Sequence, residues 1–330
     1  MAVLALVLSA AGIGAWMLWQ EYRTFLSTPL SLPPEGVVLE VAPGISALTL
    51  GRELERKRWL KGGGFLRLML RQRPELAAIK AGEYRLEPGL TPVTLFELLI
   101  SGRTVSHSIT FPEGWTFRQW RRAMDDHPAL QHRLRDLSDA EVMRLLGHEG
   151  EHPEGRFFPD TYHFPRGFSD LELLKKAWRR MERELEAAWK GRDPDLPLKT
   201  PYELLILASI VEKETGVPEE RARIAGVFVR RLKKGMKLQT DPTVIYGMGA
   251  RYQGNIRKRD LREDTPYNTY VHAGLPPTPI CMPGRDALLA AAHPAPGRSL
   301  YFVARGDGTH EFSDDLEAHN RAVRKFQLKR

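Results

Sequence analysis

Cysteine is almost absent from this 330-residue chain, since Cys281 is the only one. A single cysteine cannot form an internal disulfide, and it excludes a zinc site built from cysteines. Histidine does not replace it, because the histidines lack the spacing of metal ligands. We therefore expect no metal and no cofactor, and we expect the following histidines to hydrogen-bond or pack: His152, His163, His272, His293, His310 and His319.

The common catalytic and nucleotide-binding motifs are absent as well. The sequence contains no G-x-x-x-x-G-K-[ST] loop, no G-x-G-x-x-G after a strand, no H-E-x-x-H and no G-x-S-x-G. These absences disfavour phosphoryl transfer, dinucleotide binding, metallohydrolysis and serine hydrolysis. Internal repeats and low-complexity tracts are also missing, so a repeat architecture is not expected.

The excess of positive charge is moderate, at a formal net charge of +8. A basic chain suits an anionic polymer or surface as partner. The Lys and Arg clusters are not interleaved with stacking aromatics, and the usual nucleic-acid-binding motifs do not occur. The clusters are typical of solvated helix faces, and we expect no nucleic-acid partner.

The first 19 residues carry no charge and end with Trp16 and Trp19. A helix needs about 20 apolar residues to cross a bilayer, and tryptophan is common at the membrane interface. We interpret residues 1–20 as a single-pass transmembrane anchor. The alternative is a cleaved signal peptide, for which the small residues of LSAAG offer a cleavage site.

The rest of the chain predicts an α+β fold. A proline-rich linker occupies residues 21–36, and residues 37–105 contain a strand, two helices and a second strand. Amphipathic helices dominate the middle of the chain, including a long one over 169–189. Beyond Gly235 we expect polar and proline-rich loops, then a helix near 284–292, a strand over 299–305 and a final helix.

A helix over residues 201–214 ends in two glutamates. Thr200 is a good N-cap, Glu203 completes a T-x-x-E capping box, and we expect Gly216 to end the helix. Carboxylates avoid apolar surroundings unless they are paired or used, because desolvation disfavours the charged form. Glu212 and Glu214 are therefore either end-of-helix carboxylates in water or working groups.

Helix geometry separates the two glutamates. Residues three or four apart share a face, so Leu204, Leu207 and Val211 form an apolar stripe that ends in Glu214. Glu212 falls instead on the face that carries Ser209. A carboxyl group at the end of an apolar stripe should have a raised pKa, as a general acid near neutral pH requires.

Two later segments, 237–247 and 266–280, are rich in groups that could bind a polyol. Hydroxyl, amide and aromatic side chains suit a sugar, because its ring has polar edges and apolar faces. Ordinary turn chemistry is the alternative explanation. The side chains concerned are Gln239, Thr240, Asp241, Thr243, Tyr246, Asn268, Thr269 and Tyr270.

The segment ASIVEKETG (208–216), followed by ERARIAGVFVRRLKKGMKLQTDPTVIYGMG (220–249), resembles the signature region of the YceG/MltG family of endolytic murein transglycosylases. The resemblance continues through YNTYVHAGLPPTPI (267–280) and LYFVARGDGTHEFS (300–313). Upstream, PEGWT (112–116) and EGRFFPDTY (154–162) also match. It runs from about residue 37 to the end.

The resemblance implies an organisation and a location. Residues 37–105 would be a LysM-like module, and residues 106–330 a YceG-like catalytic domain. The chain would sit in the bacterial inner (plasma) membrane, with its catalytic domain on the periplasmic side. Its partners would be peptidoglycan glycan strands and the membrane, with peptidoglycan synthases as further candidates.

The resemblance also implies an activity: cleavage of the β-1,4 bond between N-acetylmuramic acid and N-acetylglucosamine in nascent strands, leaving a 1,6-anhydro end and terminating glycan chains. Glu214 matches the catalytic acid, while Glu212 and Asp241 are each either a second carboxylate or a neighbour. The candidates for substrate binding are Gln239, Thr240, Tyr246, Asn268 and Tyr270. A non-catalytic peptidoglycan-binding scaffold is the alternative function.

Overall fold

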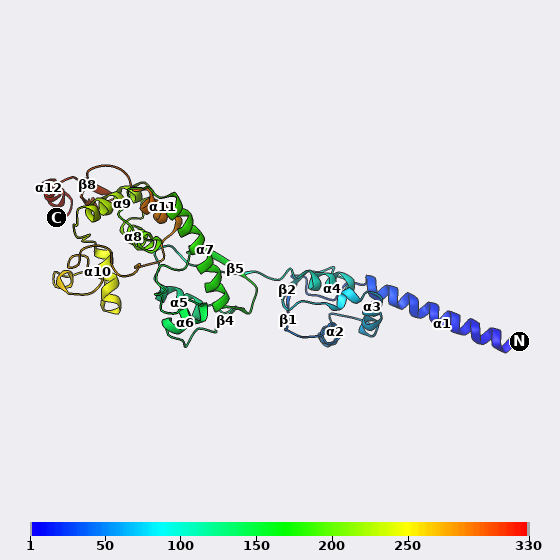
Figure 1. Cartoon of the computed structure of the whole chain (residues 1–330). Helices are drawn as coiled ribbons and strands as arrows, with labels where there is room; N and C mark the ends of the chain where they lie inside the picture. Colours follow the sequence, from blue (N-terminus) through cyan, green and yellow to red (C-terminus); the bar gives the residue numbers. More distant parts are fainter. Residues whose placement is uncertain (1, 329–330) are drawn as a thin grey trace. The chain divides into compact units, whose positions relative to one another are not determined.

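The computed structural model describes residues 2–328, with side chains from residue 6 onward. The described chain divides into two compact units (Figure 1). One comprises the residues up to His107 together with His163–Phe168, and the other comprises Ser108–Tyr162 and the residues from Ser169 onward. Each unit has its own hydrophobic core.

The N-terminal unit has the predicted strand–helix–helix–strand order. Strands β1 and β2 pair antiparallel, with Val37 opposite Leu86 and Val41 opposite Gly82. Helix α4 begins at a Thr91 cap and ends at the left-handed Gly102. The elements are α1 (Ala2–Ser27), β1 (Val37–Val41), α2 (Ala47–Arg56), η1 (Gly63–Phe65), α3 (Leu66–Gln72), η2 (Pro74–Ala77), β2 (Gly82–Leu86) and α4 (Pro92–Ser101).

Helix α1 covers the segment predicted as an anchor, except Met1, which lies outside the described residues. Apolar side chains from Leu6 to Trp19 are exposed along it. Its last turns join the core of the unit, where Tyr22 donates a hydrogen bond to Gln72 Oε1 at 2.7 Å. Within the described residues, no helix has both the length and the apolar character that a membrane span requires.

The second unit is mainly helical, with short two-stranded sheets. Strand β3 pairs with β5, β4 with β6 and β7 with β8. Strands β3, β5 and β6 contain residues of both units. The elements from His107 onward are β3 (His107–Thr110), α5 (Phe117–Asp125), β4 (Leu130–Gln131), α6 (Asp139–Leu146), β5 (Thr161–Phe164), β6 (Phe168–Ser169), α7 (Asp170–Gly191), α8 (Pro201–Glu214), α9 (Pro218–Lys233), α10 (Asp241–Met248), η3 (Gly249–Arg251), η4 (Asp260–Arg262), α11 (Arg285–Ala292), β7 (Tyr301–Ala304), β8 (His310–Ser313) and α12 (Leu316–Phe326).

Helix α8 is the centre of this unit. It packs against α7, α9, α10 and α11, and every residue from Leu204 to Val211 is buried. The N-cap is confirmed, because Thr200 Oγ1 accepts the Glu203 N–H. The expected capping box is not formed, since the Glu203 carboxylate accepts the N–H of Lys199 instead. A helix with buried sides delivers its last residues into the interior of the unit.

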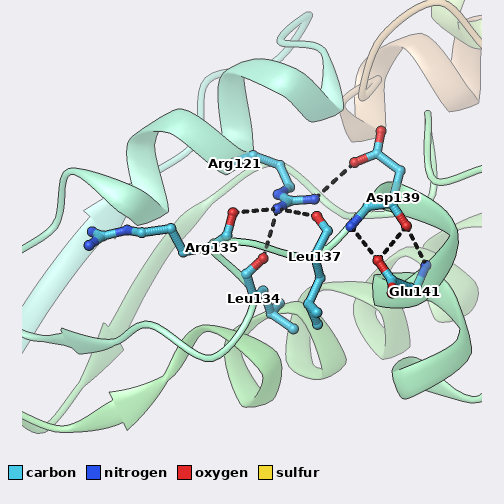
Figure 2. A network of polar contacts seen from close by, with 7 residues as sticks. Arg121, Leu134, Arg135, Leu137, Asp139 and Glu141 are labelled. Carbon is cyan, nitrogen blue, oxygen red and sulfur yellow. Dashed lines mark hydrogen bonds and ion pairs between the residues drawn. The ribbon is translucent and has the colours of Figure 1, made fainter.

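Arg121 of α5 links this helix to the start of α6. Figure 2 shows the Arg121 guanidinium surrounded by acceptors: it donates to Asp139 at 3.0 Å and to the carbonyl of Leu137 at 2.8 Å, and it also bonds the carbonyls of Leu134 and Arg135. Glu141 closes a capping box with Ser138 at the start of α6. This network fixes the 134–138 turn between α5 and α6.

Beyond Gly235, helix α10 and strand β8 lie where the sequence predicts no helix or strand, whereas the predicted strand over 299–305 is confirmed. Residues Asp241–Met248 form α10, which starts at the Thr240 cap position with Pro242 in its first turn. Helix α10 is short and weakly amphipathic, so the hydrophobic periodicity of the sequence does not reveal it. The predicted strand over 299–305 is β7, and it forms an antiparallel hairpin with β8, in which Tyr301 lies opposite Ser313.

Candidate active site

A cavity of about 460 Å³ lies at the C-terminal end of α8. Helices α8, α9 and α12, the segment leading into α10, and the β7–β8 hairpin all contribute to its wall. The lining residues are Glu214, Arg231, Leu238, Gln239, Asp241, Tyr270, Tyr301, Phe302, Val303, Ala304, His310, Leu316, His319, Val323 and Gln327.

Glu214 is the last residue of α8 and is only partly exposed. Helix α8 ends there because Thr215 is extended, not because Gly216 caps it as predicted. Burial raises the pKa of the Glu214 carboxyl from 4.5 to about 7, and the nearby Asp241 charge adds to this. The Thr240 hydroxyl donates a hydrogen bond to Glu214 Oε1, which opposes the rise. At neutral pH the carboxyl group is therefore balanced between its acid and its base form.

Thr240 is held by an unusual backbone conformation. The preceding Gln239 has φ 50°, and within residues 2–328 only one other non-glycine residue, Arg58, has positive φ. Thr240 occupies the N-cap position of α10, but its hydroxyl makes no cap bond and goes to Glu214 instead. Its N–H donates to Thr269 Oγ1 at 3.1 Å. Strained backbone of this kind is found preferentially at functional sites.

Arg231 of α9 supports this segment. The side chain is buried, and its Nη1 donates to the carbonyls of Lys237 at 3.1 Å and Leu238 at 2.9 Å. Its Nε donates to the Leu300 carbonyl at 2.7 Å, and the guanidinium lies 5.0 Å from the centre of the Tyr301 ring. Arg231 thus links α9, the segment that carries Thr240, and strand β7.

Asp241 and Tyr270 meet at the cavity wall. The Tyr270 hydroxyl donates to Asp241 Oδ1 at 2.6 Å, and both side chains line the cavity with Glu214. Burial raises the pKa of Tyr270, so its hydroxyl stays a donor. Asp241 is thus a second carboxylate in the same cavity.

Glu212 faces a different part of the unit. Its Oε2 accepts the N–H of Gly284 at 2.9 Å, and its Oε1 lies 3.9 Å from Arg221 Nη2. Burial raises the pKa of Glu212 as well. The single apolar stripe expected from the sequence is therefore not what separates the two glutamates, because Ser209 on the Glu212 side is as buried as Val211. They differ in what they face: Glu214 faces a cavity and Glu212 faces packed protein.

Three predicted sugar-binding residues, Thr240, Tyr246 and Asn268, are not among those that line the cavity, although Thr240 bonds Glu214. Asn268 is buried, and its side-chain amide donates to the carbonyls of Asp260 and Glu263. The Tyr246 hydroxyl donates at 3.0 Å to Glu154, a buried carboxyl whose pKa burial raises to about 8. Gln239, Thr240, Asp241 and Tyr270 are brought together with Glu214.

Several residues that line the cavity were not predicted as site residues from the sequence. Arg231, Tyr301, His310 and His319 come from separate elements, and no local pattern ties them to Glu214. His310 was expected to hydrogen-bond, and it does: its ring Nδ1 lies 2.7 Å from Glu220 Oε2. Only the fold brings these side chains to one cavity. Among the described residues, no group of three or more His, Cys, Asp or Glu side chains is arranged to hold a metal ion.

Comparison with known proteins gives consistent matches. The YceG-like family model matches residues 39–325. An endolytic murein transglycosylase of Bacillus subtilis is 32% identical over 267 residues, covering 76% of this chain and 74% of that protein. One of Streptococcus pneumoniae is 27% identical, covering 87% of this chain and 58% of that protein. The crystal structure of a YceG-like protein from Listeria monocytogenes has a TM-score of 0.53 and 28% identity, covering 88% of this chain and 99% of that one. The chain belongs to the YceG-like family.

Proposed function

We propose that the chain is an endolytic peptidoglycan lytic transglycosylase. It cleaves the β-1,4 bond between N-acetylmuramic acid and N-acetylglucosamine within glycan strands and leaves a 1,6-anhydro-muramoyl end. The family and the names of the relatives from B. subtilis and S. pneumoniae support this proposal. The observation that carries it is the carboxyl group of Glu214, which faces the cavity with a pKa of about 7.

One carboxyl group can perform the whole reaction. Glu214 in its acid form gives its proton to the glycosidic oxygen as the bond to C1 of the muramoyl unit breaks. The resulting carboxylate then takes the proton of the 6-hydroxyl of the same sugar as its oxygen bonds to C1. Ordinary glycosidases use two carboxyl groups, because an external water or an enzyme nucleophile must be activated. An internal hydroxyl also has the rate advantage of an intramolecular nucleophile.

The neighbours of Glu214 suit these two roles. Thr240 donates to Glu214 Oε1, which orients the carboxyl group and stabilises the carboxylate once its proton has left. We propose that Gln239, Asp241 and Tyr270, which line the cavity, hold the glycan. Tyr246 and Asn268 would act indirectly, because their polar atoms bind protein groups.

The activity is tested by digesting purified sacculi and uncross-linked glycan strands with the full chain and analysing the products by mass spectrometry. Transglycosylation gives muramoyl ends that are lighter by one water than the products of hydrolysis. Hydrolytic ends alone would refute the proposed reaction. Binding of sacculi without any product, at every pH from about 4 to 8, would favour a non-catalytic scaffold.

We also propose that α1 anchors the chain in the bacterial plasma membrane, with the second unit on the outer side. The support is the row of exposed apolar side chains from Leu6 to Trp19. Cell fractionation with an alkaline wash tests this, because an anchored chain stays with the membrane. Recovery of the full-length chain in the wash would refute it.

The β1–α2–α3–β2 region is proposed as a LysM-like module that binds glycan, and peptidoglycan synthases are proposed as partners. The paired strands with helices between them support the first proposal. Pull-down of sacculi tests the module by comparing the full chain with a variant in which Arg52 and Arg56 of α2 are replaced. Equal retention of both would count against a glycan-binding surface on α2.

A further inference from the structure

His310 at the start of β8 lines the cavity that holds Glu214, yet the reaction described above gives it no role. Glu220 of α9 holds it at two points. The backbone N–H of His310 donates to Glu220 Oε1 at 3.0 Å, and its ring Nδ1 lies 2.7 Å from Glu220 Oε2. Both side chains are largely buried, with 11% and 9% of their surface exposed. The imidazole ring is therefore fixed in place.

The other ring nitrogen, Nε2, makes no hydrogen bond to any of the described residues. A carboxylate at Nδ1 keeps the proton on that nitrogen, so the neutral ring presents an acceptor at Nε2. Phe302 packs edge-to-face with the ring, at 5.4 Å between centroids and 88° between planes, and limits its rotation. A fixed acceptor is thus available at the cavity.

Other histidine–carboxylate pairs in the chain have the same contact without this placement. His293 Nδ1 lies 2.8 Å from Asp193, but each side chain is 47% exposed. His272 pairs with Asp264 at 2.7 Å and is 48% exposed. Neither histidine lines the cavity. Burying a charged partner such as Glu220 is costly, so its pairing with a histidine that lines the cavity points to a use beyond surface solvation.

We propose that His310 is a substrate-binding residue of the transglycosylase, and that Glu220 is its positioning residue. His310 Nε2 accepts a hydrogen bond from a hydroxyl or an acetamido N–H of the N-acetylhexosamine unit next to the bond that Glu214 cleaves. This inference rests on the proposed function and adds a contact to it. His310 transfers no proton, and both proton transfers of the reaction stay with Glu214.

Two substitutions at His310 separate binding from mere packing. In His310→Asn the side-chain amide can still reach Glu220, but it ends short of the Nε2 position. In His310→Gln the amide reaches the Nε2 position and loses the Glu220 contact. We expect His310→Asn to lower kcat/KM on glycan strands about tenfold, mainly through KM, and His310→Gln to stay within about threefold of the unchanged chain.

The opposite order would overturn the proposal: if His310→Asn behaves like the unchanged chain and His310→Gln is impaired, His310 serves only to hold Glu220. Equal kinetics for both variants and the unchanged chain would overturn it too. His293→Asn is the matched control and should change nothing. If the unchanged chain forms no anhydro ends, the proposed function has failed, not this contact alone.

Binding without turnover gives a second readout. Calorimetric titration of the inactive Glu214→Gln chain with a (GlcNAc–MurNAc) oligosaccharide should show about tenfold weaker binding when His310→Asn is added. Adding His293→Asn instead should leave the affinity unchanged. Unchanged affinity with His310→Asn would overturn the proposal.

If His310→Asn does not fold, Glu220→Gln tests whether the contact between Glu220 and His310 supports substrate binding. The amide that replaces the Glu220 carboxylate has one acceptor oxygen instead of two, and an amide N–H facing Nδ1 would turn Nε2 into a donor. We expect about a tenfold loss in kcat/KM with an unchanged unfolding temperature. Unchanged kinetics of this variant would overturn the proposal.

Discussion

The last turn of α8 carries two glutamates whose surroundings are opposite in kind. Each carboxylate oxygen of Glu212 has a partner in the surrounding protein: Oε2 accepts the Gly284 N–H, and Oε1 forms an ion pair with Arg221. Among the described residues, Glu214 has one side-chain donor, Thr240, and it otherwise faces the cavity. Burial raises the pKa of both carboxyl groups.

A raised pKa alone therefore does not identify the acid. Glu154 has a pKa of about 8, higher than that of Glu214, but its oxygens accept bonds from the Phe117 N–H and Tyr246 inside the core. What distinguishes Glu214 is burial combined with an open side on which a substrate can lie.

Glu214→Gln is expected to lower kcat on glycan strands by roughly a thousandfold or more, because general acid–base catalysis of this kind contributes on the order of 10²–10⁴ and here one group serves in both steps. Glu212→Gln is the matched control, with the same change two residues away on the same helix turn. It should retain activity within about threefold, since Gln can still accept the Gly284 N–H. Loss of activity in Glu212→Gln but not in Glu214→Gln would reverse the assignment.

The pH dependence of the two carboxyl groups should differ in its effect on activity. Glu214 must be protonated to act as acid, so kcat/KM should fall about tenfold per pH unit above its pKa of about 7. This basic limb should persist in Glu212→Gln. A flat profile of kcat/KM between about pH 6 and 9 would contradict the role of Glu214.

Stability should follow the same titration. The folded pKa of Glu214 lies above its ordinary value of 4.5, so its contribution to stability is full below that value and is lost as pH rises through about 7. Glu214→Gln removes this loss and should be more stable than the unchanged chain by about 1–3 kcal/mol at high pH. Urea unfolding at about pH 5 and pH 8 measures it, with the larger difference expected at the higher pH.

Glu212→Ala should cost stability, not chemistry. It leaves the buried Gly284 N–H without its acceptor and Arg221 without one of its partners, at an expected cost of about 1–3 kcal/mol. Glu212→Gln keeps the acceptor and should cost less than about 1 kcal/mol. Thermal unfolding compares the two. Equal losses for the two variants would mean that the charge, which both remove, and not the hydrogen bond, which only Ala removes, fixes this side of α8.

Sequence patterns predicted α8 and α11 beside this turn, because both carry apolar runs and α8 also has a clear N-cap. Helix α8 begins at its predicted cap, and α11 lies within the predicted 284–292 range. The pattern missed α10, since eight residues with Pro242 near the start read as a turn. Short elements are fixed by tertiary contacts, such as those of Thr269 with Thr240 and Thr243.

The site was predictable only in part. Glu214, Gln239, Thr240 and Asp241 lie near one another in the sequence, and the fold keeps them together. His310 lies far along the chain and reaches the cavity through the β7–β8 hairpin. Helical spacing could not reveal that both sides of α8 are buried, because Ser209 reads as polar but donates to the Ile206 carbonyl and accepts the Ile280 N–H.

Thr240→Val tests the one donor to Glu214 with little change of shape. Loss of the hydroxyl removes a bond that favours the carboxylate, so the basic limb of the pH profile should move to higher pH. We expect kcat to fall by roughly threefold to tenfold, because the carboxyl group loses its orientation. The pH profile of kcat/KM is the measurement. A limb that moves to lower pH would show that Thr240 stabilises the acid form.

Gly284→Ala should have the smallest effect, on the Glu212 side. A Cβ at this position would lie 1.8 Å from Glu113 Oε1, but that atom ends a flexible side chain which is about half exposed. Glu113 can swing into solvent, so the cost should be below about 1 kcal/mol, whereas overpacking against fixed atoms costs about 1–3 kcal/mol. Gly226→Ala gives the contrast, since its Cβ would meet the Ala295 carbonyl at 2.5 Å inside the helical core. Unfolding in urea should show that Gly226→Ala is much less stable than Gly284→Ala. Similar losses of stability would mean that the Glu113 side of the α8 turn is as rigid as the core.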